Sequence, residues 1–205
     1  MLFPTTCPMC ERPGPAPCAG CLATLQPAPS LAVPTGLVAC RALLAYDGPG
    51  RDLVARLKYR NARSALPWLA AGMAALTVAA GDEVDVVTWA PTTAQRRRER
   101  GFDQAELLAR RVARELRCPA VALLQRRPGP HQTGLRLAER QTGPCFRPRR
   151  VAGRAVPRRH VLLVDDVVTS GATLTRASRV LADAGAAAVV GLAAARTAPP
   201  RARAP

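Results

Sequence analysis

Residues 161–173 read VLLVDDVVTSGAT, and this stretch decides the fold. Four apolar residues lead directly into the adjacent Asp165 and Asp166, and two valines separate this acidic pair from a TSGAT segment. A Leu- and Ala-rich segment with helical spacing comes next. The pattern predicts a buried strand, a tight loop and the start of a helix.

The loop after the acidic pair has the properties of a phosphate-binding turn. Where a strand passes into a helix, the first backbone N–H groups of the helix lack partners and converge on one spot that attracts anions. Gly171 lets the backbone approach closely or take a positive φ angle. Thr169, Ser170 and Thr173 add hydroxyl donors. We therefore expect this loop to bind a phosphate.

The acidic pair indicates what carries the phosphate. Asp165 and Asp166 would lie beside it, which is unfavourable for two negative charges unless they hold hydroxyl groups or a divalent cation. Phosphate, ribose hydroxyls and Mg²⁺ together describe a phosphorylated sugar. The alternative is an ordinary strand-to-helix turn with a capped helix, which explains neither the acidic pair nor the three hydroxyl residues.

Residues 161–173 resemble the phosphoribosyl-pyrophosphate (PRPP) loop of the type I phosphoribosyltransferases, which has a hydrophobic strand, two acids, two apolar residues and a Thr/Ser/Gly cradle. The resemblance implies an α/β fold with a parallel sheet flanked by helices. It also implies that Thr169, Ser170, Gly171, Ala172 and Thr173 hold the 5′-phosphate. By the same resemblance Asp165 and Asp166 hold the ribose hydroxyls, and Mg²⁺ bridges ribose and pyrophosphate.

Composition sets outer limits on fold and function. A chain of 205 residues allows one α/β domain of about 150 residues and a small appendage. With 48% hydrophobic but only 3% aromatic residues, the core must consist of Ala, Val and Leu. The net charge is +16, and it fits either a solvated basic surface or polyanion binding. We find no membrane span and no signal peptide, and we expect a cytoplasmic protein.

Four of the seven cysteines form two CxxC pairs near the start, Cys7/Cys10 and Cys18/Cys21. The seven residues between the pairs are rich in Pro and Gly and have no apolar content to fold by themselves. Four thiolates at this spacing suit a structural, tetrahedral Zn²⁺. Two disulfides and a redox CxxC are the alternatives. The other cysteines, Cys40, Cys118 and Cys145, are expected to be buried or half-buried small residues.

The rest of the chain predicts a four-cysteine module with its linker over 1–34, a phosphoribosyltransferase-like domain over 37–196 and a disordered tail over 197–205. Within the domain we expect strands at 37–46, 84–90, 119–124 and 186–194, a turn at 47–50, helices at 51–59, 62–80, from Asp103 and at 172–184, and a lid at 125–159.

Several basic residues are candidates for contact with the pyrophosphate. Lys58 is the one lysine in a chain that otherwise uses arginine, which favours a site that needs a compact charge. Arg96 and Arg100 lie in a basic loop after the strand at 84–90, on the rim where open α/β sheets bind ligands. The lid carries further polar candidates: Gln132, Arg136 and Arg140.

The combination of motifs resembles the ComF family, the competence-associated phosphoribosyltransferase-like proteins of bacteria. The shared features are the four-cysteine module, LKYR at 57–60, RRRERGFDQAELLA at 96–109, the lid and VDDVVTSGAT. The lid departs from the family pattern, because Gln141, Thr142 and Gly143 stand where an Asn usually follows the arginine at 140. The resemblance implies a role in DNA uptake during transformation.

The leading hypothesis is therefore a PRPP-binding phosphoribosyltransferase-like protein in which Asp165, Asp166 and Lys58 are the catalytic candidates. Charge develops on the departing pyrophosphate, so pre-placed cations are the main means of catalysis. The alternative is a non-catalytic accessory factor that binds nucleotides or single-stranded DNA, or works with the DNA-uptake machinery. Scarce aromatic residues argue against the stacking surface that such proteins use. Amidotransfer is disfavoured because no N-terminal nucleophilic cysteine is present.

Overall fold

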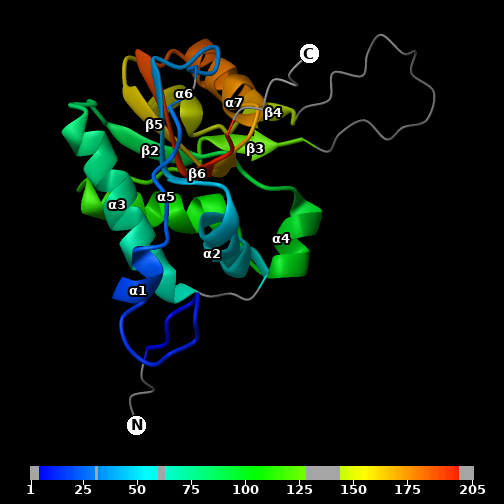
Figure 1. Cartoon of the computed structure of the whole chain (residues 1–205). Coiled ribbons are helices and arrows are strands. Elements are labelled where there is room, and N and C mark those ends of the chain that lie inside the picture. The colour runs from blue at the N-terminus through cyan, green and yellow to red at the C-terminus, as the bar shows by residue number, and fades with distance from the viewer. Residues whose placement is uncertain (1–4, 31, 60–62, 128–143, 199–205) are drawn as a thin grey trace, which may run out of the picture.

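The computed structural model describes residues 5–30, 32–59, 63–127 and 144–198 (Figure 1). Its elements follow in the order α1 (Ala19–Leu22), β1 (Ala39–Ala45), α2 (Gly48–Tyr59), the 3₁₀ turn η1 (Arg63–Ala65), α3 (Leu66–Ala79), β2 (Val86–Trp89), α4 (Ala94–Arg100), α5 (Gln104–Glu115), β3 (Leu124–Arg126), β4 (Phe146–Pro148), α6 (Ala152–Ala155), β5 (His160–Val168), α7 (Ala172–Asp183) and β6 (Ala188–Arg196).

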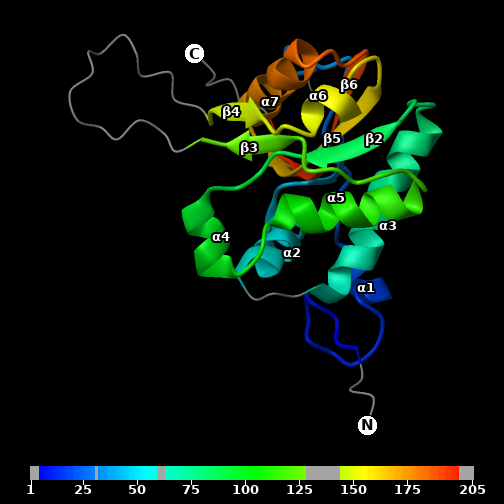
Figure 2. The ribbon, with the colours of Figure 1, turned by 180° about the vertical axis from the view of Figure 1, so that it is seen from behind.

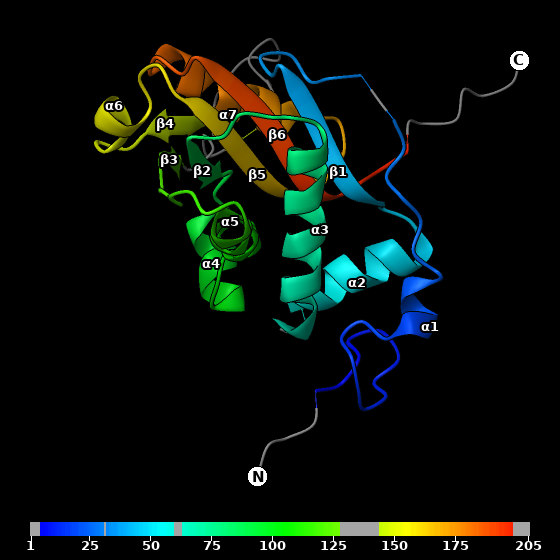
Figure 3. The ribbon, with the colours of Figure 1, turned by 90° about the vertical axis from the view of Figure 1, so that its left-hand side faces the viewer.

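The main sheet has four parallel strands in the order β1-β6-β5-β2. Strand β5 is paired on both sides, so that Val164 lies between Trp89 of β2 and Leu192 of β6. The helices α3 and α5 cover one face and α7 covers the other (Figure 3). The expected α/β fold with a parallel sheet between helices is therefore confirmed.

Two apolar clusters, one on each face of the sheet, form the core. On one face Leu69, Met73 and Leu108 of α3 and α5 are completely or almost completely buried. On the other face Leu174 and Leu181, which belong to α7, are completely buried. Nearly all core residues are Ala, Val or Leu, as the composition predicts. Because β-branched and aliphatic residues fill both faces, β6 is buried almost throughout and β5 is buried from Val161 to Val164.

The expected strand at 119–124 is wrong in part. Ala120 makes one parallel bridge to Val87, and the chain then leaves the main sheet. The N–H of Leu123 donates to the Thr88 side-chain hydroxyl at 3.3 Å, so a side chain takes the place of the next backbone acceptor. Residues 124–126 instead form β3, which pairs with β4 in a separate antiparallel ribbon (Figure 2).

Other expected boundaries also need correction. The turn expected at 47–50 is already the first turn of α2, where the N–H of Arg51 donates to the Asp47 carbonyl at 2.9 Å. Pro49 is tolerated there because the first N–H groups of a helix need no partner within it. The region 125–159 is not one irregular lid, since β4 and α6 lie within it.

The segment that we expected to be a free linker, 27–34, is attached to the sheet. Ala28 donates its N–H to Leu43 and Ala45 donates to Gln26, so the segment begins as a short antiparallel addition to β1. None of the helices in the described residues combines the length and hydropathy that a bilayer crossing demands.

Gly50 offers a direct test of the contact between α2 and β1. A Cβ at this buried position would collide with the backbone carbonyl oxygen of Ala45, which cannot move without disturbing β1. We expect Gly50→Ala to lower the free energy of unfolding by about 1–3 kcal/mol, the usual range for overpacking. Chemical denaturation measures this change.

The matched control is Gly153→Ala in α6, where a Cβ meets nothing within 4 Å. The control should be neutral or slightly stabilising, because alanine restricts the unfolded chain more than glycine does. Equal stability of the two variants would contradict the close approach of Gly50 to β1.

Candidate functional site

The acidic pair and the TSGAT loop lie together at the carboxyl end of β5. The strand runs through both aspartates and ends at Val168, and Gly171 then begins α7 with φ at +75°. A small cavity of about 20 Å³ is lined by the acidic residue, the loop and the first helical turn: Asp165, Val167, Val168, Thr169, Gly171, Ala172, Thr173 and Leu174. Asp165 therefore borders the loop directly.

The loop is open on its outer side. Thr169 and Ser170 are exposed, and the Ser170 hydroxyl accepts the N–H of Ala172 at 3.4 Å. On its inner side Gly171 touches the linker, since a Cβ there would lie 2.7 Å from Cγ of Pro34. The positive φ and this contact together explain the need for glycine. An anion can approach the exposed hydroxyls from solvent.

The two aspartates are connected through the backbone. Oδ1 of Asp165 accepts the N–H of Asp166 at 2.9 Å, which fixes the direction of the Asp165 carboxylate. Burial lowers the pKa of the Arg126 guanidinium, and the charge of Arg96 lowers it further, while Asp165 and Asp103 act in the opposite direction. These charges share one electrostatic environment at the carboxyl end of the sheet.

The segment carrying Arg96 and Arg100 is a helix, and the expectation of a basic loop is wrong. Thr93 caps α4 by accepting the N–H of Arg96 at 3.2 Å, and Gly101 ends the helix with φ at +77°. All residues from Ala94 to Glu99 are exposed. Arg97 contacts Glu106 at 3.6 Å, and Arg100 donates to Oε1 of Gln104 at 3.1 Å. Arginines one turn apart thus have fixed partners on α5.

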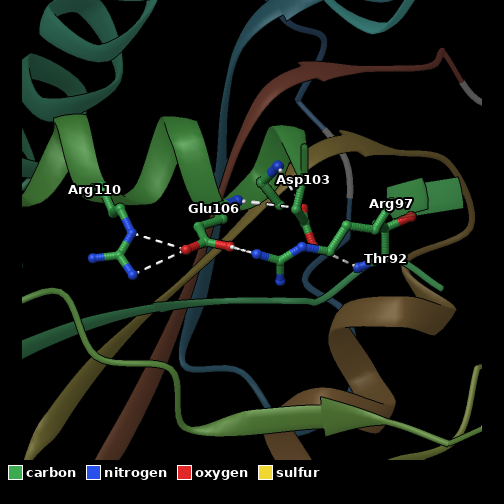
Figure 4. A network of polar contacts seen from close by, with 6 residues as sticks. Thr92, Arg97, Asp103, Glu106 and Arg110 are labelled. Atoms are coloured by element: carbon green, nitrogen blue, oxygen red, sulfur yellow. Dashed lines mark hydrogen bonds and ion pairs between the residues drawn. The ribbon is translucent and has the colours of Figure 1, made fainter. Parts of the chain in front are cut away.

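Asp103 is the buried anchor between the two helices, and sequence reasoning recognised it only as the start of a helix. Its carboxylate accepts the backbone N–H groups of Thr92 at 2.8 Å, Ala105 at 3.1 Å and Glu106 at 3.4 Å (Figure 4). The residue is only 4% exposed. By joining the end of the β2 loop to the first turn of α5, Asp103 sets the position of α4.

Other expected site residues lie outside what the structure describes. Lys58 belongs to the last turn of α2, but its side chain is not among the described groups. The lid candidates Gln132, Arg136 and Arg140 fall in 128–143, which is also outside the described residues.

The four cysteines of the CxxC pairs converge. Their Sγ atoms all lie within 4.8 Å of one another, and Sγ of Cys10 is 3.7 Å from Sγ of Cys18. A tetrahedron of sulfurs bound to Zn²⁺ at about 2.3 Å has edges of about 3.8 Å. Four close cysteines can therefore bind a structural metal, and their geometry fits a tetrahedral ion.

The thiols of this cluster differ in acidity. Burial opposes ionisation of Cys7, but backbone N–H donors from Cys10, Cys18 and Met9 outweigh it and lower the pKa of Cys7 to about 6. Burial and the neighbouring thiols raise the pKa of Cys21 to about 12. Cys7 is thus a thiolate near neutral pH. The Cys21 thiol keeps its proton until a metal cation displaces it.

The four-cysteine module rests on the main domain. Met9 packs against the core cluster of α2 and α3, Arg56 pairs with Glu11 at 2.8 Å, and the Ser64 hydroxyl donates to the Thr6 carbonyl at 3.4 Å. The module thus contacts both α2 and η1.

The chain is similar to a known domain family and to several known proteins. Residues 103–204 match the phosphoribosyl transferase domain family. The chain is 29% identical to the DNA utilization protein YhgH of Escherichia coli K12 and to that of Shigella flexneri, over 90% of this chain and 81% of each relative. A solved structure of the allosteric regulatory enzyme of purine biosynthesis shares 24% identity, with a TM-score of 0.44 over 64% of this chain and 26% of that one.

Asp103 predicts a defined pH dependence of stability. Burial raises the pKa of its carboxyl above the ordinary value of 3.8, against the backbone N–H donors that lower it. The folded state therefore holds this proton more tightly than the unfolded state, and stability falls as pH rises from 3.8 through the raised pKa.

In Asp103→Asn this titration is absent, so the stability of the variant relative to wild type should rise with pH across that window. Denaturation curves at a series of pH values measure the difference. Asp183→Asn, an exposed position at the end of α7, is the control and should stay parallel to wild type. Parallel curves for Asp103→Asn as well would contradict the assigned cause.

Proposed function

The chain is a phosphoribosyltransferase-like protein of the ComF type, and from that premise we propose that it binds PRPP at the carboxyl end of β5. The observation that carries the proposal is that Asp165 lines one small cavity together with four residues of the loop, Thr169, Gly171, Ala172 and Thr173. A phosphate on the loop and a ribose held by the adjacent carboxylates are then one phosphoribosyl group. One residue of the acidic pair and the loop thus border the same space.

The residues around this site have separate proposed roles. The first N–H groups of α7 and the hydroxyls of Thr169, Ser170 and Thr173 bind the 5′-phosphate. Asp165 and Asp166 accept hydrogen bonds from the ribose hydroxyls. Their carboxylate oxygens are also the donor type that Mg²⁺ prefers, and Mg²⁺ supplies positive charge beside the pyrophosphate.

Transfer of the phosphoribosyl group requires stabilisation of the departing pyrophosphate. We assign this task to Arg96, Arg100 and Lys58, whose chain segments follow β2 and end α2. Arginine can meet two phosphate oxygens at once, and Gln104 holds the Arg100 guanidinium in place. Pre-placed charge of this kind lowers the barrier because it need not reorganise during reaction.

The four-cysteine module is proposed to hold one structural Zn²⁺. Its four sulfurs would fill all positions of a tetrahedral ion and would leave no open position for catalysis. A site of four thiolates needs reduced cysteines, which supports a reducing, cytoplasmic location. We divide the chain accordingly into the four-cysteine module with its linker at 1–34, the main domain at 37–196 and a tail at 197–205.

We further propose a role in DNA uptake, supported by the similarity to a DNA utilization protein. The alternative is a nucleotide- or single-stranded-DNA-binding factor without catalysis, and the exposed arginines of α4 favour it. Against it, the large hydrophobic residues exposed in the described part of the chain are all valines. Bases would find no aromatic surface there on which to stack.

Calorimetry with PRPP and Mg²⁺ tests the main proposal. We expect a binding heat, and we expect Asp165→Asn/Asp166→Asn to weaken binding about a hundredfold or more, because two charged hydrogen-bond acceptors are lost. Asp183→Asn makes the same chemical change at an exposed position away from the loop and should bind like wild type. Salt-sensitive binding of single-stranded DNA without any PRPP heat would favour the alternative.

Elemental analysis tests the metal. We expect about one zinc per chain, none in Cys18→Ser/Cys21→Ser, and a lower melting temperature in that variant because metal binding stabilises the folded segment. Cys145→Ser, an exposed cysteine outside the cluster, should keep both zinc and stability. A zinc-free chain with the wild-type melting temperature would refute the structural role.

A further inference from the structure

A second, larger cavity lies at the edge of the sheet, apart from the phosphate loop. Its volume is about 370 Å³, within the range of about 300–1,000 Å³ typical of small-molecule sites. It lies between the linker, β1 and the end of α3. Figure 3 shows α3 beside β1 at this edge of the sheet. Its lining consists of three linker residues, three residues of β1, the end of α3 and one residue of β6: Ala28, Pro29, Ser30, Cys40, Arg41, Ala42, Leu76, Ala79, Ala80 and Arg196.

Arg196 is the unusual member of this lining. It is the last residue of β6, paired in register with Ala45 and Val168, and only 5% exposed. One Nη donates to the Ala32 carbonyl at 2.8 Å. Its Nε is buried and has no hydrogen-bond partner among the described residues. A buried guanidinium with an unsatisfied donor is costly unless something supplies the missing acceptor.

None of the residues that line the cavity is acidic. Asp82 is engaged by Arg41 in a two-pronged ion pair, with N–O distances of 2.6 and 2.7 Å, so these two charges cancel. Burial raises the pKa of Cys40, although Arg196 acts to lower it, and the thiol stays neutral. The cavity therefore carries net positive charge from Arg196.

The rest of the lining is mostly apolar and suits a hydrocarbon group. Ala28, Pro29, Ala42 and Leu76 form apolar walls, and Ser30 adds a hydroxyl. An occupant that satisfies both parts of the cavity has one oxyanion head for the guanidinium and a short apolar body for the walls.

We propose that this edge cavity binds a small organic oxyanion, a phosphate monoester or a carboxylate, whose head pairs with Arg196. Binding in this cavity does not require PRPP on the phosphate loop. The cavity and the loop are nevertheless connected in two ways. Arg196 is in register with Val168, which directly precedes the loop, and the linker that covers Arg196 also touches Gly171 through Pro34. A ligand in the cavity can thus influence the phosphate loop from the side that faces the linker.

The test follows the Nε–H of Arg196 by NMR of ¹⁵N-labelled full-length protein. A buried Nε–H exchanges slowly with water, and Arg196→Lys identifies its resonance by removing it. Titration with n-butyl phosphate should shift this resonance in a saturable manner, and with a higher affinity than inorganic phosphate because the butyl group covers the apolar walls.

A matched pair of variants on α3 locates the binding. Ala79 and Ala75 are both exposed, but only Ala79 lines the cavity. Ala79→Glu should weaken binding about fivefold by repulsion of the anion, while Ala75→Glu should leave it unchanged.

Three outcomes would overturn the proposal. The first is the absence of any shift of the Arg196 resonance. The second is an equal effect of the two glutamates, which would indicate only a general change of charge. The third is an affinity unchanged by Ala79→Glu, which would place the phosphate on the loop at 169–173. That outcome would leave PRPP binding untouched, so the two proposals can fail separately.

Discussion

The pairing of β5 on both sides is the constraint on which the structure depends. Because β2 and β6 both hold its backbone up to Val164, and β6 stays paired with it as far as Val168, the strand can carry Asp165 and Asp166 near its end without fraying. The same pairing lets Gly171 start a helix at a fixed place, so carboxylates and helix N–H groups face one region. In water, either group alone would bind a sugar phosphate weakly. In the proposed site one strand holds both groups together, so that little ordering is left to lose when a ligand binds.

The linker is the second organising element, and its contacts explain the burial of several unusual residues. It first extends the sheet beside β1, next accepts a hydrogen bond from Arg196, and then reaches Gly171 through Pro34. A segment with three prolines would be a flexible tether if it stood free. Here its backbone is paired at one end and packed at the other. The four-cysteine module is thereby connected to the back of the phosphate loop.

Sequence reasoning succeeded where local pattern and tertiary structure demand the same thing. The apolar run at 161–164 leads into turn residues and so predicts a buried strand, and the paired CxxC motifs have the spacing of a four-sulfur metal site. Sequence reasoning failed where a single tertiary contact decides which element the chain forms. Residues 96–100 are helical because Thr93 and Gly101 cap them and Asp103 fixes their entry, while their dense charge suggested a loop. Thr88 diverts the chain at Leu123, and Arg196 extends β6 by pairing with Val168. No composition or periodicity reveals such partners.

The position of the four-cysteine module gives it more than a local role. Its exposed ion pair, Arg56 with Glu11, contributes little because water screens it. Met9 and Leu25 contribute more, since they pack against the main core cluster. A module without a core of its own can place these residues only if its sulfurs are held by a metal. Helix α2 carries Lys58 in its last turn and Arg56 next to the module, so a metal in the module would also steady the helix to which we assign one pyrophosphate contact. The proposed metal and the proposed phosphoribosyl site would thus be linked through α2.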